Sequence, residues 1–120
     1  MLNIVISHFH EDHITNLSRI KYDNLYVSRN TIKYTKSGEI IDEITNFDEN
    51  PQIRLFPVPS SHAKGCLGFV CGEYAFLGDS TYSKMVGDLH TFNAQLLQAQ
   101  IQLLSSLPVK FVCLDHSKEF

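Results

Sequence analysis

The sequence lacks the features that mark several specialised classes of protein. It has three cysteines in 120 residues, an odd number without a closely spaced pair, so it provides no disulfide framework. We therefore expect buried thiols in a reducing compartment. No apolar run approaches the roughly 20 residues that cross a bilayer, which predicts no membrane association. The net charge of −3 and the pI near 6.0 give no broad basic field, which argues against nucleic acid as a partner.

The first residues also lack the parts of a signal peptide. The segment MLNIVI has no basic region, no long apolar stretch and no small-residue cleavage site. We therefore expect a cytoplasmic protein. Its 43% apolar and 19% charged residues are ordinary for a globular protein, and 120 residues suffice to bury a core. The expected organisation is a single domain, residues 1–120.

Short apolar runs between polar loops predict an α/β chain. The best predicted helix is 92–107, where apolar residues recur at three- and four-residue steps and Pro108 ends the pattern. Gly72-Glu73 predicts a two-residue turn between strands 67–71 and 74–77. Further strands are predicted at residues 2–6, 24–28, 40–44, 53–58 and 110–114, a short helix at 14–20 and a polar loop at 46–52, while residues 31–36 fit either state.

Potential metal ligands follow four of the predicted strands. Loops at strand ends are where rigid scaffolds commonly carry functional residues. Histidine nitrogens and carboxylate oxygens are ligands of zinc, iron and manganese. The candidates are His8, His10, Asp12 and His13 after the first strand, and His62, Asp79 and His116 after three later strands.

This set of candidate ligands is too large for one ion and suits two. One metal takes three or four protein ligands. A carboxylate can bridge two cations and offset part of their repulsion. Two ions roughly 3.5–4 Å apart can hold a water and lower its pKa from 15.7 to about 7, which supplies hydroxide at neutral pH. The residues therefore indicate hydrolysis at a dinuclear centre.

The same residues resemble the metallo-β-lactamase superfamily. Residues 8–13, HFHEDH, match its H-x-H-x-D-H signature, and three further segments match in chain order: VPSSHAKGCLGF, YAFLGDSTY and LLSSLPVKFVCLDH. The resemblance covers essentially the whole chain. It implies an α/β fold of the αββα sandwich type with metals at the strand ends. We expect a reduced form of that sandwich, because the family has strands before the signature strand, which here begins at Met1.

The resemblance also implies a role for each candidate ligand. Asp12 and Asp79 are the expected catalytic carboxylates, with Asp12 accepting a proton as hydroxide attacks. The expected cofactors are two Zn2+ ions, with iron or manganese as alternatives. The implied ligand sets are His8, His10 and His62 for the first metal, and Asp12, His13 and His116 for the second, with Asp79 bridging.

Details of the motifs favour hydrolases. The third position of the signature is His10, where the flavodiiron oxidoreductases have a glutamate. In this respect the sequence resembles the zinc hydrolases. Asp79 in a Gly-Asp turn resembles the thioesterase, lactonase and phosphodiesterase branches, the glyoxalase II-like enzymes included. The absence of a cysteine second-site ligand argues against β-lactam hydrolysis. We therefore expect metal-bound hydroxide to attack a small-molecule ester, thioester, lactone or phosphodiester, and Lys64, Tyr82 and Lys84 can meet an anionic substrate.

Two alternatives stay open. The family's domain is longer than this chain, and an uncovered first strand is a liability. The domain would then bind metal with little or no activity and act as a partner or homodimer subunit, with a second chain covering that strand. Some relatives with this motif set bind one iron and oxidise persulfides, so a mononuclear-iron oxidoreductase is the other alternative. Only four residues follow His116, so we expect no separate substrate-binding domain, which counts against a complete glyoxalase II.

Overall fold

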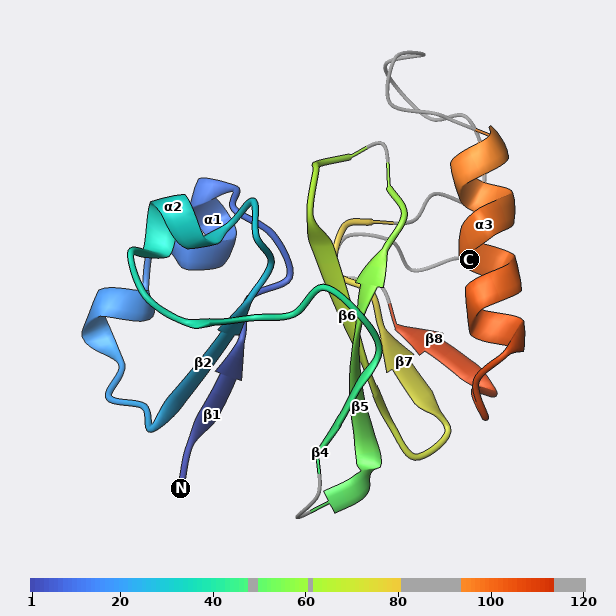
Figure 1. The fold of residues 1–120 in the computed structure, drawn as a ribbon, viewed down its shortest axis with the longest axis horizontal. Helices are drawn as coiled ribbons and strands as arrows, with labels where there is room; N and C mark the ends of the chain where they lie inside the picture. The colour runs from blue at the N-terminus through green and yellow to red at the C-terminus, as the bar shows by residue number, and fades with distance from the viewer. Residues whose placement is uncertain (48–49, 61, 81–93, 114–120) are drawn as a thin grey trace.

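The computed structural model describes residues 1–47, 50–60, 62–80 and 94–113, which form two sheets (Figure 1). The first sheet has the strand order β1-β2-β3 and the second the order β4-β5-β6-β7-β8. No helix within the described ranges is long and apolar enough to cross a membrane. The elements are β1 (Asn3–Val5), α1 (Glu11–Ile14), η1 (Leu17–Arg19), β2 (Asn24–Val27), α2 (Ile32–Thr35), β3 (Glu39–Ile40), β4 (Thr45–Phe47), β5 (Asn50–Val58), β6 (Cys66–Cys71), β7 (Tyr74–Phe76), α3 (Ala94–Ser105) and β8 (Phe111–Cys113).

The first sheet is parallel, because helical segments carry the chain back after β1 and after β2. Ile4 lies opposite Leu25 in the register of β1 and β2. Alternate side chains of a strand point to opposite faces. Leu25 and Val27 accordingly pack with apolar residues of α1 and α2 on one face, while Tyr26 and Val5 pack toward the second sheet.

The second sheet is antiparallel from β4 to β7 and ends in the parallel pair β7–β8. The predicted hairpin is confirmed: β6 and β7 pair through a tight turn in which Gly72 has a φ of 60°. A positive φ costs glycine little, since it has no Cβ. α3 lies between β7 and β8 in the chain, and this crossover makes their pairing parallel.

Three apolar cores make the fold layered. The first lies between the first sheet and its helices, where Leu25 and Val27 are buried. The second lies between the sheets and includes Ile41 and Leu55. The third lies between the second sheet and α3, where Phe56 is among the buried residues. The layers are therefore helices, sheet, sheet and helix (Figure 1), and the expected α/β class is confirmed.

Several predicted elements differ from the structure. The helix expected at 14–20 is wrong, since α1 begins at Glu11 inside the HFHEDH segment and only the 3-10 turn η1 follows. Two carboxylates in its first turn favour this start, because anions stabilise a helix N-terminus. The strand expected at 40–44 is also wrong, since β3 ends at Ile40.

The second sheet also extends into the segment expected to be a loop. The end of β4 and the start of β5 lie within residues 46–52, and pairing with β5 places Asn46 opposite Arg54. The ambiguous segment 31–36 contains α2. The helix expected at 92–107 is observed as α3, with residues 92–93 outside the described part of the chain.

Candidate metal centre

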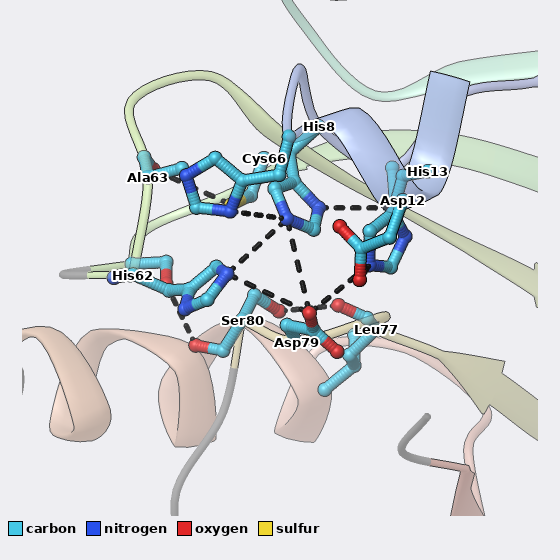
Figure 2. A network of polar contacts seen from close by, with 12 residues as sticks. His8, Asp12, His13, His62, Ala63, Cys66, Leu77, Asp79 and Ser80 are labelled. Carbon is cyan, nitrogen blue, oxygen red and sulfur yellow. Dashed lines mark hydrogen bonds and ion pairs between the residues drawn. The ribbon is translucent and has the colours of Figure 1, made fainter. Parts of the chain in front are cut away.

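Five potential ligands converge beside the ends of β1 and β7. Figure 2 shows His8, His13, His62 and Asp79 around one point. Four of them are histidines. His8 and His10 follow β1, His13 lies on α1, and His62 lies between β5 and β6. Asp79 follows β7. A backbone hydrogen bond joins the two sheets beside the site, because the amide of Leu67 donates to the carbonyl of Ser7 at 2.7 Å.

Three histidines form the first group. Nε2 of His8 lies 3.0 Å from Nδ1 of His10 and 3.2 Å from Nε2 of His62. The His8 side chain is 1% exposed, so its ring is held inside the protein. These are the three residues expected at the first metal, and the structure brings them together.

Asp79 lies between this group and His13. Its Oδ2 is 3.0 Å from Nε2 of His13, 3.6 Å from Nε2 of His62 and 3.8 Å from Nε2 of His8. His8, His13 and Asp79 form a second set of donors close enough to share one ion. The carboxylate therefore lies within 3.8 Å of a histidine on α1 and of two histidines of the first group.

The other residues expected at the site, both ligands and substrate contacts, are placed differently. Oδ2 of Asp12 is 3.5 Å from Nε2 of His13, and its side chain is 66% exposed, so it lies at the rim of the site. Lys64 is exposed on the loop that carries His62. His116, Tyr82 and Lys84 lie outside the described residues, and their expected roles stay predictions.

The donor set fits a metal ion. A tetrahedral zinc with Zn–N bonds of about 2.0–2.1 Å holds its ligand atoms roughly 3.3 Å apart. The contacts of His8 with His10, His62 and Asp79, at 3.0, 3.2 and 3.8 Å, lie on either side of that value. Donor atoms at these separations are close enough to share one cation.

Burial keeps the central histidines in the form that binds metal. Desolvation and the neighbouring imidazoles lower the pKa of His8 to about 4. Desolvation, followed by His10, also lowers the pKa of His62 below its usual 6.5. Both rings are therefore neutral near pH 7, as metal ligation requires.

Ser7 supports the site and was not predicted from the sequence. Its hydroxyl lies 3.1 Å from Nδ1 of His8 and 3.1 Å from Nδ1 of His13. When both Nε2 atoms bind metal, each Nδ1 carries the proton, and the two lone pairs of one hydroxyl oxygen can accept both. Ser7 thus orients two rings at once, as outer hydrogen bonds to metal-bound histidines do. Its position directly before His8 was the available signal.

Gly65 allows the loop that carries His62 to pack closely on the end of β2. Its φ is 74°, and a Cβ there would lie 2.5 Å from Oγ of Ser28 and 2.8 Å from Cβ of Asn30. A side chain is therefore excluded by space as well as by backbone conformation. This contact fixes one side of the loop between β5 and β6.

Comparisons with known proteins give relatives in sequence and in structure. No family model matches the chain. It is 33% identical over 119 residues to hydroxyacylglutathione hydrolase of Wigglesworthia glossinidia brevipalpis, covering 94% of this chain and 46% of that protein. The hydroxyacylglutathione hydrolase of Buchnera aphidicola subsp. Schizaphis graminum is 26% identical over 126 residues, covering 97% and 48%. The chain thus spans about half the length of the curated relatives it matches.

Two solved structures share the fold. The chemotaxis sensor ODP, described as a peroxy diiron species, superposes with a TM-score of 0.74 at 13% identity, covering 98% of this chain and 62% of that one. VMB-1 superposes with a TM-score of 0.69 at 20% identity, covering 95% and 59%. At these identities the likeness shows a shared fold and does not show a shared chemistry.

Proposed function

We propose that this chain carries the catalytic metal centre of a hydrolase of the metallo-β-lactamase superfamily, and its sequence likeness to hydroxyacylglutathione hydrolases and the fold it shares with the two solved structures support this proposal. The observation that carries the proposal is the convergence of His8, His10, His13, His62 and Asp79 on one point between the sheets. The relatives named as hydroxyacylglutathione hydrolases support hydrolysis as the reaction class.

The proposed site is dinuclear. His8, His10 and His62 would hold one zinc, and His13 would hold a second, with Asp79 between them. We propose Asp12 and His116 as the remaining ligands of the second ion. Bound zinc supplies Lewis acidity and lowers the pKa of coordinated water.

The protein groups have separate tasks in this proposal. Asp79 would balance the positive charge of the bound ions, because its Oδ2 lies within 3.8 Å of three imidazoles that would hold them. Asp12, exposed at the rim, takes up a proton where solvent can remove it. Ser7 holds the rings of His8 and His13 in orientation.

We propose an acyl thioester as the first substrate class to test. The relatives' names support it over an ester, a lactone or a phosphodiester. The exposed Lys64 lies two residues after His62 and can meet an anionic substrate. We expect no β-lactam hydrolysis, because the sequence has no cysteine at the motif position where the zinc β-lactamases carry a second-site ligand.

A substrate panel tests the proposal. Zinc-loaded protein would be assayed with a hydroxyacyl thioester of glutathione, a lactone and bis(4-nitrophenyl) phosphate. Asp79→Asn removes the central charge, and Asp42→Asn is the matched control, because Asp42 forms a surface ion pair with Arg29. We expect hydrolysis by the wild type and the control and its loss in Asp79→Asn. Equal rates in both variants would contradict the site assignment.

A second candidate function is a metal-binding subunit completed by another chain. β1 is the outer strand of the first sheet, and no described strand pairs with its free edge. The carbonyl of Leu2 and the amide of Ile6 form hydrogen bonds with β2. Because alternate residues of a strand direct their backbone groups to opposite edges, those of Asn3 and Val5 face the free edge. An apolar groove of about 530 Å³ lies beside them, lined by residues that include Phe47 and Phe69. An added strand would extend the ladder and fill this groove.

Light scattering distinguishes the two functions. An active monomer argues against the subunit function, whereas a dimer that Val5→Lys dissociates supports it. The identity of the metal in purified protein tests the alternative of a mononuclear-iron oxidoreductase. Recovery of one iron with no hydrolytic activity would favour that alternative over the zinc hydrolase.

A further inference from the structure

The face of α3 that packs on the sheet carries a buried glutamine. Gln100 is 3% exposed and follows Leu96 by one helical turn on the side that also contains Leu103 and Leu107. An apolar side chain is expected at such a position. A buried amide is stable there only when its donors and acceptor are hydrogen-bonded.

The amide of Gln100 reaches two loops of the second sheet that carry potential ligands, those of His62 and Asp79. Its Nε2 donates to the carbonyl of Pro59 at 2.5 Å and to the carbonyl of Ser80 at 2.6 Å. Pro59 lies three residues before His62, and Ser80 directly follows Asp79. A side-chain amide has two N–H donors, so one group can serve both loops.

Ser60 closes the link between these loops. Its hydroxyl donates to the same Ser80 carbonyl at 2.8 Å and accepts from the backbone amide of His62 at 3.1 Å. The backbone of His62 is therefore tied to the residue after Asp79. Figure 2 shows Ser80 and Asp79 lying next to the ribbon of α3, below His62 and His8.

We propose that Gln100 is a positioning residue of the metal centre, which sets the separation of His62 and Asp79 by holding their loops against α3. In the structure this separation is 3.6 Å between Nε2 and Oδ2. The inference rests on the proposed metal site, since it concerns ligands of that site. Loss of the amide would remove the Gln100 hydrogen bond from both carbonyls, with the Ser80 carbonyl retaining the bond from Ser60, and let the two loops move apart.

Cobalt binding tests this inference without relying on activity. The d–d absorption of Co2+ reports the geometry of its ligands, and competition with a chromophoric chelator reports affinity. The variants are Gln100→Met, which keeps the length of the side chain, and Ser60→Ala, which removes the second link without altering α3. The exposed Gln98→Met and Gln102→Met are controls on the same helix.

We expect Gln100→Met and Ser60→Ala each to weaken cobalt affinity by roughly 10–100-fold and to shift the absorption bands, as changes in outer-shell support do. The controls should match the wild type. Wild-type affinity and spectrum in folded Gln100→Met would overturn the inference. If Gln100→Met does not fold, Ser60→Ala decides in the same way. Absence of cobalt binding by the wild type would instead overturn the proposed function, and the inference with it.

Discussion

Nε2 of His13 and Oδ2 of Asp79 lie 3.0 Å apart, although 66 positions separate them in the chain. His13 belongs to α1, which follows the first sheet's edge strand, and Asp79 follows β7 in the second sheet. The contact therefore joins the two sheets at the proposed metal centre. Each part of the site depends on how the sheets and their loops are held together, which leads to the following predictions.

Ser7→Ala should weaken zinc binding while leaving the fold intact. The substitution removes the hydroxyl that lies 3.1 Å from Nδ1 of both His8 and His13. We expect zinc affinity to fall roughly 10–100-fold, as it does when outer hydrogen bonds to metal-bound histidines are lost. Chelator competition measures the effect. Ser105→Ala, an exposed helix serine, is the control, and equal affinities in the two variants would exclude the role of Ser7.

Metal-free protein should lose stability as the pH falls from 7 to 5. His8 has a pKa of about 4 when folded and 6.5 when unfolded. The unfolded chain thus binds the extra proton first, and the stability that comes from neutral His8 is lost as the pH falls below 6.5. The expected loss between pH 7 and pH 5 is about 2 kcal/mol. Chemical denaturation at both pH values measures it.

His8→Phe gives the control for the pH effect. This variant keeps a ring at the site but cannot be protonated, so its metal-free form should show a smaller pH dependence. An unchanged dependence would mean that other groups cause the effect.

Gly65→Ala should destabilise the protein more than Gly72→Ala. Both glycines have positive φ values, 74° and 60°, so both substitutions strain the backbone by about 1 kcal/mol or more. At Gly65 the new Cβ would also lie 2.5 Å from Oγ of Ser28, whereas at Gly72 it meets nothing within 4 Å. Denaturant titration of metal-free protein compares the two. Equal losses of stability would argue against the close packing of the His62 loop.

The thiols should react in the order of their exposure. Cys71 is exposed, whereas Cys66 is 2% exposed and its Sγ lies 3.3 Å from the carbonyl of Ala63. Burial also raises the pKa of Cys66, which lowers the fraction of reactive thiolate. Ellman's reagent should show a fast phase that Cys71→Ser removes. A fast phase that Cys66→Ser removes instead would contradict the placement of β6.

Much of the site could be predicted because its ligands follow recognisable strands. β1, β5 and β7 have apolar sequences, and parallel or paired strands bring their ends together at one edge. The sequence alone therefore predicts that His8, His62 and Asp79 lie close together. The start of α1 inside the signature was not predicted, because its capping depends on the extended backbone of His10 rather than on apolar periodicity.

The supporting residues were harder to predict because their roles depend on distant partners. Ser7 acquires its role from His13, six positions away, and Gln100 from two carbonyls about 20 and 40 positions away in the chain. β4 was missed for a similar reason, since its polar Asn46 is placed by pairing with Arg54 in β5. Such contacts are created by the fold and leave little local pattern.

Metal content is the most direct test of the central claim. Metal-free protein would be loaded with zinc, freed of unbound ions by gel filtration and measured by inductively coupled plasma mass spectrometry. We predict two zinc ions per chain in the wild type and a clear reduction in His8→Phe, because His8 belongs to both donor groups. Less than one equivalent of zinc, iron or manganese in folded wild-type protein would contradict the account.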